Sequence, residues 1–326
     1  MTTLDALQQT IAPELQRLNR RISDSLTSSN ALMNNVVEGY LKHKGKQIRP
    51  ILVVLSARLL GEVNEKVINA GAAVEMLHNA SLIHDDVVDE TKMRRGNETI
   101  NAMWDNHIAV LVGDFFVSSA LQRAIDTGDI RIVNSIASLG RLLSLGEIDQ
   151  IYNARYHTLD ENAYFEIISR KTASLFVACV EMGGYAVGAD DTRIAALRRF
   201  AEDLGLCFQI KDDIFDYFSD AKIGKPTGND LREGKITLPL LHALTAAPLP
   251  ERQEMAELAR REELDAEAID TLIDFAKRAG GIDYAYGRMA ALRDNAVKAL
   301  REAFPDAPSQ VDDFVAIFDY IITRDK

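Results

Sequence analysis

Apolar residues recur at steps of three and four positions along most of this chain, which is the spacing of one face of an α-helix. The clearest run lies between Gly280–Gly281 and Pro305, residue types that typically bound helices. Its apolar positions are Ile282, Ala285, Met289, Leu292, Ala296 and Leu300. The same period predicts long helices over about residues 66–90 and 193–218. No linker, repeat or low-complexity segment interrupts the pattern, so the sequence predicts a single all-α domain over residues 1–326.

Composition supports a globular helical protein. Hydrophobic residues make up 47% of the 326 positions, which is enough for a large buried core, and the chain has only 19 Gly and 8 Pro. The formal net charge of −12 at pH 7 disfavours binding to nucleic acid or to an anionic membrane surface. An anionic substrate would therefore need a local cluster of Lys and Arg side chains, or a metal ion.

Three features predict where the protein is found. Both cysteines, Cys179 and Cys207, lie in apolar stretches, as expected of small core residues in a reducing cytoplasm. Residues 1–21 have the pattern of an amphipathic helix and lack the apolar segment of a secretory signal. The longest uncharged run, residues 236–250, contains three prolines and is too short to span a membrane. We therefore predict a cytoplasmic protein without a membrane-spanning helix.

An acidic DDxxD motif occurs twice, each time within a helical pattern. Its aspartates are Asp85, Asp86 and Asp89 in the first copy and Asp212, Asp213 and Asp216 in the second. The first and last aspartates of a copy are one helical turn apart, with Cβ atoms about 5–6 Å apart, where like charges repel mildly. A bound cation would reverse that penalty, and carboxylate oxygens suit Mg²⁺ that bridges to substrate phosphates. One copy alone could equally be a solvated acidic face, but the recurrence favours a metal site that grips a diphosphate and makes it a good leaving group.

Basic and hydroxyl side chains that could bind a diphosphate are available along the chain. They are Lys46, Arg49, Arg94, Arg95, Lys171, Thr172, Lys211, Lys225 and Lys235. Each of them taken singly is more typical of a solvated surface residue. Several follow or adjoin an acidic motif in the chain, and this placement favours a binding role.

The order of these motifs resembles the all-trans isoprenyl diphosphate synthase (polyprenyl synthetase) family. The matching segments are GKQIRP at 45–50, LIHDDVVDETKMRRG at 82–96, GD at 113–114, KT at 171–172, FQIKDDIFDYF at 208–218 and GKPTGNDLREGKITLP at 224–239. Together they span most of the chain and are specific, whereas each alone is weak. Phe215 departs from the pattern, because an aliphatic residue is more usual there, but it should leave metal binding intact. The resemblance implies an isoprenoid synthase-type helical bundle around a central apolar cavity, and a homodimer.

The resemblance also implies two substrates and their sites. An allylic prenyl diphosphate would be held through Mg²⁺, about three ions in all, by Asp85, Asp89 and Asp212, with Asp86, Asp213 and Asp216 as further ligands or behind them. The same diphosphate would contact Arg94, Lys171, Thr172, Gln209, Lys225 and Lys235 directly. Isopentenyl diphosphate would bind Lys46, Arg49, His78 and Arg95, with Arg324 and Lys326 closing over it. His78 lies two turns before Asp85 and so on the same helix face.

The implied reaction is an electrophilic prenyl transfer. The metal and the basic residues would stabilise the departing diphosphate, so that the allylic C–O bond ionises to a carbocation. The double bond of isopentenyl diphosphate would attack that carbon, and the released diphosphate would take the proton. Closure of the loop at residues 221–234 would exclude water from the cation.

Product length should depend on the wall of the apolar cavity. Ala80 and Ser81 lie about one helical turn before Asp85 and are both small, where short-chain family members commonly have a bulky aromatic residue. We therefore predict a long product, octaprenyl or nearby, for a quinone side chain, released through a peripheral membrane contact. Two alternatives stay open: both residues could be small only for helix packing, or Phe165 or Phe176 could cap the tunnel.

Other functions match the sequence less well. A class I terpene cyclase shares the first acidic motif, but its second motif usually reads NDxxSxxxE. A non-catalytic synthase subunit typically lacks one or both acidic motifs. A di-iron bundle would need a second ExxH besides Glu75–His78, and a P-loop would need Gly and Ser/Thr around Gly45–Lys46. A short-chain farnesyl or geranylgeranyl diphosphate synthase stays the main alternative.

Overall fold

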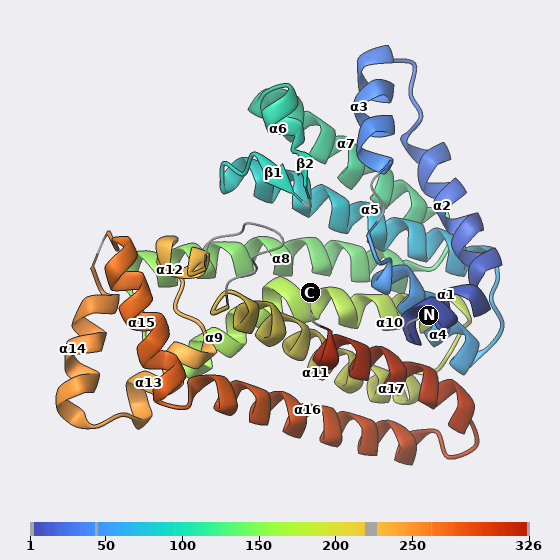
Figure 1. Ribbon diagram of the computed structural model, residues 1–326. Helices are drawn as coiled ribbons and strands as arrows, with labels where there is room; N and C mark the ends of the chain where they lie inside the picture. The colour runs from blue at the N-terminus through green and yellow to red at the C-terminus, as the bar shows by residue number, and fades with distance from the viewer. Residues whose placement is uncertain (1–2, 43–44, 95, 219–226, 262, 325–326) are drawn as a thin grey trace. The chain divides into compact units, whose positions relative to one another are not determined.

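The computed structural model describes residues 3–42, 45–94, 96–218, 227–261 and 263–324. Over these residues the predicted all-α fold class is confirmed, with a single small hairpin among the helices (Figure 1). The helices are α1 (Thr3–Thr10), α2 (Ala12–Leu26), α3 (Ala31–Leu41), α4 (Ile48–Leu60), α5 (Glu65–Val88), α6 (Ile100–Met103), α7 (Asn106–Ile125), α8 (Ile130–Tyr156), α9 (Glu161–Ile168), the π-helix η1 (Ser169–Ala173), α10 (Ser174–Ala186), α11 (Asp191–Phe215), α12 (Asn229–Arg232), α13 (Leu238–Ala246), α14 (Leu249–Ala259), α15 (Ala266–Arg278), α16 (Gly281–Ala303) and α17 (Pro308–Thr323). Strands β1 (Met93–Arg94) and β2 (Asn97–Glu98) pair antiparallel.

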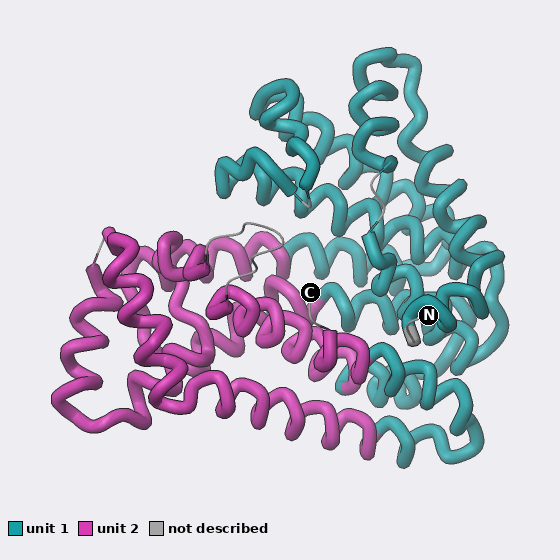
Figure 2. The backbone as a smooth tube through the Cα atoms, in the orientation of Figure 1, with its two compact units in different colours: residues 1–141, 175–199, 300–317 teal, residues 142–174, 200–299, 318–326 magenta. Residues whose placement is uncertain are grey.

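The chain forms two compact units, which Figure 2 shows in different colours. Unit 1 comprises residues 1–141, 175–199 and 300–317, and unit 2 comprises residues 142–174, 200–299 and 318–326. The boundaries fall inside helices α8, α10, α11, α16 and α17. The first acidic motif therefore belongs to unit 1 and the second to unit 2. The organisation of the chain as a single domain stays a prediction.

The core of unit 1 is built around two helices that are buried along most of their length. In α4, the residues from Ile51 to Val54 are completely buried. Helix α5 packs against α2, α4 and α7 and is buried along most of its length up to Ile83. The burial of both flanks fixes the axis of α5, and the polar residues that follow Ile83 form its last turn. The fold thus delivers the first acidic motif at the end of a rigid helix.

Unit 2 contains a separate apolar cluster that forms after the second acidic motif. Its buried members are Tyr217, Leu231, Leu240, Ala243, Leu244, Met255, Ala259, Ile269, Leu272, Ile273, Phe275 and Ala276. They come mainly from α13, α14 and α15, which pack on one another. This cluster anchors the chain immediately after α11 and so supports the segment that carries the second motif.

The long helices agree closely with their predicted bounds. Helix α16 begins directly after Gly280, whose φ of 78° is favourable only for glycine, and it ends before Pro305. Its predicted apolar face is buried, with Ala285, Met289 and Leu300 fully inaccessible. Both cysteines are free and buried, as predicted. The β1–β2 hairpin was not predicted, because strands of two residues are too short to show an alternating pattern.

One helix bears on the predicted absence of a membrane span. By length and composition, α7 is apolar enough to cross a membrane, although the buried core helix of a globular protein has the same properties. Its buried face includes Val112, Phe116 and Ala120, which pack within unit 1. The absence of a membrane span therefore stays a prediction.

A half-buried carboxylate on α11 should make stability depend on pH. Burial raises the pKa of Asp203 from 3.8 to about 6, and the neighbouring Glu202 adds to the shift. A carboxyl group whose pKa is raised on folding destabilises the folded state as pH rises through that value. We expect Asp203→Asn to stabilise the protein at pH 8 by on the order of 1 kcal/mol and much less at pH 4. Thermal melts at both pH values test this, and an equal shift at the two values would contradict it.

Candidate active site

The first acidic motif occupies the C-terminal end of α5, in unit 1. Asp85 and Asp86 belong to the last turn, and the N–H of Asp89 donates to the carbonyl of Asp85 at 2.8 Å. Asp85 is partly exposed and Asp89 is exposed. The C-terminal end of a helix carries a partial negative charge, which disfavours a nearby carboxylate by roughly 0.3–1 kcal/mol. Carboxylates gathered there are favoured only when a cation compensates them.

Asp86 is turned into the protein, unlike Asp85 and Asp89. It is 4% exposed, and its Oδ1 accepts a hydrogen bond from Nε of Arg94 at 2.7 Å. Burial raises the pKa of Asp86, while the Arg94 guanidinium opposes the rise. The β1–β2 hairpin brings Arg94 back to the motif, and Nδ2 of Asn101 donates to the carbonyl of Asp86 at 3.1 Å. Arg95, also predicted to bind substrate, lies outside the described residues.

The structure explains the GD pair at 113–114, because both residues contact the side chain of His84. Gly113 on α7 lies directly against the imidazole of His84, so that a Cβ at this position would overlap the ring. Nε2 of His84 is 3.4 Å from Oδ1 of Asp114 and 3.3 Å from the carbonyl of Val110. His84 immediately precedes Asp85. Sequence reasoning did not single out His84, and the structure indicates that it fixes the end of α5 against α7.

The residues predicted for isopentenyl diphosphate occupy different environments within unit 1. Lys46 is exposed and precedes α4, whereas Arg49 lies in the first turn of α4. Gln47 between them adopts the left-handed conformation, with φ of 55°. The Arg49 guanidinium lies over the ring of Phe176, 5.6 Å from its centroid. His78 is buried at 8% exposure, two turns before the acidic motif.

The predicted chain-length residues lie on the same helix. Ala80 is 1% exposed, and Ser81 is partly exposed. The Ser81 hydroxyl donates to the carbonyl of His78 at 2.8 Å, so its hydrogen-bond donor already has a partner within the helix. Phe176, one of the two alternative caps, is fully buried. Ala80 therefore occupies a buried position of unit 1, where a larger side chain would have to displace its neighbours.

The second acidic motif occupies the C-terminal end of α11, in unit 2, so the same dipole argument applies to it. Asp212 is partly exposed and forms an ion pair with Arg324, near the end of the chain. Arg324 also donates to the carbonyl of Phe208 at 3.2 Å and lies over the rings of Phe208 and Phe215, with centroid distances of 4.2 and 5.6 Å. A protein cation thus already neutralises Asp212. Lys326, predicted to act with Arg324, lies outside the described residues.

The aromatic ring of Phe215, where the chain departs from the family pattern, lies close to two cationic side chains, Lys211 and Arg324. Nζ of Lys211 lies 5.0 Å from the Phe215 centroid and 5.0 Å from that of Tyr286, and it donates to the Tyr286 hydroxyl at 3.2 Å. Arg324 lies near the same Phe215 ring. An aliphatic side chain could not attract either cation in this way. Lys211 is buried and serves packing between α11 and α16.

Asp213 is buried within a chain of hydrogen bonds. Its Oδ2 accepts from the hydroxyl of Tyr164 at 2.6 Å, and its Oδ1 accepts from Nε2 of Gln209 at 2.8 Å. The Thr172 hydroxyl donates to Oε1 of the same Gln209 at 2.7 Å. Burial raises the pKa of Asp213 to about 6, and the bonds from Tyr164 and Gln209 oppose the rise. These contacts join three side chains of the predicted site, and Tyr164 is an addition that sequence reasoning missed.

The carboxylate of Asp216 accepts hydrogen bonds from the backbone of a later segment of the same chain. Its Oδ1 accepts from the N–H of Asn229 and its Oδ2 from the N–H of Asp230, both at 3.0 Å. Burial raises the pKa of Asp230 well above its usual value, with further rises caused by Asp213 and Asp216. Lys235, predicted to bind diphosphate, pairs with Glu233 at 2.5 Å. Lys225 lies outside the described residues.

Lys171 and Thr172 are carried by the π-helix η1, which continues α9. Such π-helical turns are rare and occur frequently at functional sites. Nζ of Lys171 contacts two side chains of α8, Glu147 at 2.5 Å and Gln150 at 2.6 Å. Gly146 permits this approach, because a Cβ there would come within 2.7 Å of the backbone nitrogen of Lys171. Glu147 and Gln150 were not predicted, since polar residues on a long helix are usually solvated.

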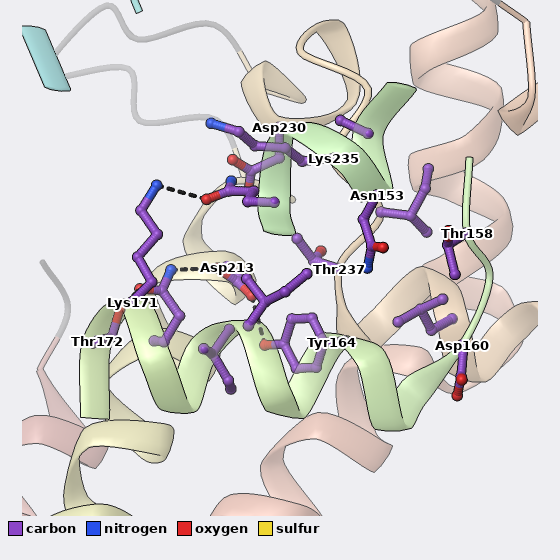
Figure 3. Close-up of a pocket in the computed structure, with 17 residues that line it drawn as sticks. Asn153, Thr158, Asp160, Tyr164, Lys171, Thr172, Asp213, Asp230, Lys235 and Thr237 are labelled. Carbon is purple, nitrogen blue, oxygen red and sulfur yellow. Dashed lines mark hydrogen bonds between the residues drawn. The ribbon is translucent and has the colours of Figure 1, made fainter. Parts of the chain in front are cut away.

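A cavity of about 170 Å³ in unit 2 brings several of these side chains together (Figure 3). Its lining includes Lys171, Thr172, Gln209, Asp213 and Lys235 from the predicted set. Its other polar residues are Gln150, Asn153, Thr158, Asp160, Tyr164, Asp230 and Thr237. Figure 3 shows Lys171 and Thr172 along one side of the cavity, with Tyr164 directed toward Asp213. Its two lysines are paired with Glu147 and Glu233, and three of its residues are aspartates, so an anionic oxygen-rich ligand would bind here together with a cation.

The donor set fits Mg²⁺ that arrives with a substrate better than a preformed metal cage. Among the described residues, no group of three or more His, Cys, Asp or Glu side chains is arranged to hold a metal ion. Mg²⁺ typically binds one or two carboxylates together with substrate phosphates and water. Asp85, Asp89 and Asp212 keep solvent access for such a role. Asp86, Asp213 and Asp216 accept hydrogen bonds from the protein, and Asp212 would have to exchange its Arg324 partner for the metal ion.

Comparison with known proteins gives the family. A model of the polyprenyl synthetase family matches residues 30–276. The octaprenyl diphosphate synthase of Escherichia coli (strain K12) is 33% identical over 306 residues, which are 94% of each chain. The chain belongs to the polyprenyl synthetase family. The resemblance drawn from the sequence motifs is thereby confirmed, and family membership favours it over the cyclase, di-iron and P-loop alternatives.

Solved structures of the family agree in fold. A decaprenyl diphosphate synthase from Rhodobacter capsulatus is 33% identical with a TM-score of 0.91 and covers 99% of both chains. A polyprenyl synthase from Caulobacter crescentus CB15, complexed with calcium and isoprenyl diphosphate, is 34% identical with a TM-score of 0.89 and covers 99% of this chain and 98% of its own. Short-chain and geranylgeranyl synthases are also similar, although the long-chain synthases favour the predicted function.

Proposed function

We propose that this protein is a Mg²⁺-dependent prenyltransferase that condenses isopentenyl diphosphate with an allylic prenyl diphosphate to an all-trans, long-chain polyprenyl diphosphate for a quinone side chain. One observation carries the proposal: each of the two acidic motifs ends a long helix, where the helix dipole disfavours its three carboxylates and one of them in each motif is paired with an arginine. Family membership supports the same reaction. A fold that concentrates carboxylates in this way is suited to gathering divalent cations around a diphosphate.

The roles of the individual residues follow from their contacts. Asp85, Asp89 and Asp212 would hold about three Mg²⁺ ions, which when bound would neutralise the diphosphate and make it a better leaving group. Asp86, Asp213 and Asp216 would orient the motifs through their protein partners. Lys171, Thr172, Gln209 and Lys235, which line the cavity of unit 2, would contact the allylic diphosphate. Lys225 and Arg94 are proposed to contact the same diphosphate from the family resemblance. Lys46, Arg49, His78 and Arg95 would bind isopentenyl diphosphate, with Arg324 and Lys326 closing over it.

The long product is supported by the small, buried side chain of Ala80 and by the octaprenyl and decaprenyl synthases among the similar proteins. A cytoplasmic location is supported by two free, buried thiols. A peripheral membrane contact would let so apolar a product leave. These three points remain proposals of the same kind.

Product analysis tests the function. The full-length protein is incubated with Mg²⁺, isopentenyl diphosphate and farnesyl diphosphate, and the products are separated by chain length. A linear polyprenyl diphosphate of about eight isoprene units is expected, a length that one helical turn of wall per unit would accommodate. A C15–C20 product would favour the short-chain alternative, and no turnover would favour a non-catalytic subunit. Formation of the same product in excess chelator would refute the Mg²⁺ dependence.

A homodimer is proposed from the surface of α8. Leu145, Ile148, Tyr152 and Tyr156 follow one another at helical spacing in unit 2 and are 44–61% exposed. A continuous apolar helix face of this kind is typical of a protein–protein interface. We expect Ile148→Asp to shift the protein from dimer to monomer in sedimentation velocity, because it places a charge in the centre of that face. Asn162→Asp, at an exposed position of α9, is the control, and a dimer in both variants would contradict the assignment.

A further inference from the structure

We propose that Tyr164 is a positioning residue, which fixes the Asp213 carboxylate and through it the Lys171–Thr172 segment. The inference rests on the proposed function, because it concerns the same diphosphate site. Tyr164 belongs to α9, outside every motif that carries the family resemblance. Its hydroxyl nevertheless donates a hydrogen bond of 2.6 Å to the second acidic motif. The hydrogen bond thus joins Tyr164, which no sequence motif indicated, to Asp213, one of the carboxylates of the second acidic motif.

Two hydrogen bonds hold Asp213 from opposite sides. Tyr164 donates to Oδ2 and Gln209 donates to Oδ1, so both oxygens of this 5% exposed carboxylate have a partner. A carboxylate fixed in this way cannot rotate toward a metal ion without breaking one of these bonds and leaving its donor unsatisfied. Asp213 is therefore expected to orient its neighbours and to leave metal contact to Asp212.

The same network reaches the side chains that would bind the diphosphate. Oε1 of Gln209 accepts from the Thr172 hydroxyl at 2.7 Å, and Thr172 follows Lys171 in η1. Tyr164 and Thr172 thus tie the α9–η1 segment to α11 at two points, before and within the π-helical turn. Both points are needed to fix the rotation of that turn, and its rotation determines where the Lys171 ammonium lies. Loss of the Tyr164 hydroxyl should free the α9 end of this segment from Asp213. It should also shift Thr172, because Asp213 and Gln209 connect the two side chains.

A buried tyrosine away from the site provides a matched control. Tyr185 on α10 is 8% exposed, and its hydroxyl accepts a hydrogen bond from Nη2 of Arg198 at 2.6 Å. Removing either tyrosine hydroxyl deletes one side-chain hydrogen bond, so the loss of stability should be similar for the two. A purely structural role for Tyr164 therefore predicts that the two Phe variants behave alike. A positioning role predicts that only Tyr164→Phe affects metal binding and catalysis.

The experiment compares Tyr164→Phe and Tyr185→Phe in the full-length protein. Mn²⁺ affinity is measured by EPR titration in the presence of inorganic diphosphate, and kcat and KM are measured with farnesyl diphosphate and isopentenyl diphosphate. We expect Tyr164→Phe to weaken Mn²⁺ binding and to lower kcat/KM by about tenfold, the lower end of the cost of losing a hydrogen bond that orients the groups of a metal site. Tyr185→Phe should stay within about twofold of the parent in both measurements while lowering the melting temperature to a similar extent.

A double-mutant cycle with Asp213→Asn tests whether Tyr164 affects catalysis through Asp213. If Tyr164 acts through Asp213, removing its hydroxyl in the Asp213→Asn background should change kcat/KM by less than about threefold. Equal effects of the two Phe variants, or additive effects in the cycle, would overturn the inference. Should Tyr164→Phe fail to fold, Gln209→Met removes the opposite bond to Asp213, and parental Mn²⁺ affinity in that variant would overturn it too. Absence of polyprenyl product from the unmodified protein would instead refute the proposed function, while the Mn²⁺ titrations would still report on Tyr164.

Discussion

Replacing Asp85 with Asn should lower kcat by at least about a thousandfold, equivalent to about 4 kcal/mol of transition-state stabilisation. Asn keeps the size and the helical position of the side chain but removes the negative charge that would bind Mg²⁺. The N–H of Asp89 bonds to the backbone carbonyl of residue 85, so the helix end should remain intact. The effect should therefore fall on metal-dependent turnover and not on folding. Steady-state rates over a range of Mg²⁺ concentrations measure it.

Asp191→Asn supplies the control for this variant. Asp191 is an exposed aspartate in the first turn of α11 and belongs to an Asp pair that does not complete the motif. It should retain the parental rate, which would show that loss of one acidic charge alone is harmless. Turnover by Asp85→Asn within tenfold of the parent at every Mg²⁺ concentration would contradict a metal role for Asp85. Because the helix dipole disfavours carboxylates at this end, we also expect Asp85→Asn to unfold at a slightly higher temperature in metal-free buffer.

The long helices and the candidate site were predictable because their signals are local. Helical spacing fixed the extent of α5, α11 and α16 to within a few residues, since a buried apolar face leaves a regular trace in the sequence. The two acidic motifs were recognisable because the pattern recurs. Neither signal required knowledge of which helices pack together.

Other features depend on contacts between distant segments and left no trace in the pattern. Tyr164 is separated by 49 positions from the carboxylate to which it donates. The role of Glu147 and Gln150 depends on the close approach of α8 to η1 at Gly146, and an isolated glycine within a helical pattern is ambiguous. Arg324 was predicted to close over isopentenyl diphosphate, whereas in this structure it pairs with Asp212. Long-range pairing of this kind follows from the fold and not from local sequence.

The second large effect is expected from Ala80→Tyr, which should shorten the product to about C15–C20. Ala80 is 1% exposed and lies one turn before Asp85, so a phenol there would occupy the level that an elongating chain must pass. Each further isoprene unit needs roughly one helical turn of wall. The blocked chain would therefore stop after a few condensations, while the diphosphate sites and the rate of the first condensation should be unaffected. Product lengths by chromatography, with the single-condensation rate measured alongside, separate these two effects.

A graded series distinguishes a tunnel wall from a packing contact. If Ala80 lines the tunnel, Val, Leu and Tyr at this position should shorten the product progressively as the side chain lengthens. If Ala80 only packs against neighbouring helices, the same series should cost about 1–3 kcal/mol of stability through overpacking, lower the melting temperature progressively, and leave the product unchanged. Ser81→Tyr probes the adjacent side chain, whose hydroxyl is turned back onto the His78 carbonyl. Shortening by Ser81→Tyr but not by Ala80→Tyr would assign the wall to that neighbouring face of α5, and an unchanged product in both folded variants would leave Phe165 or Phe176 as the residue that limits chain length.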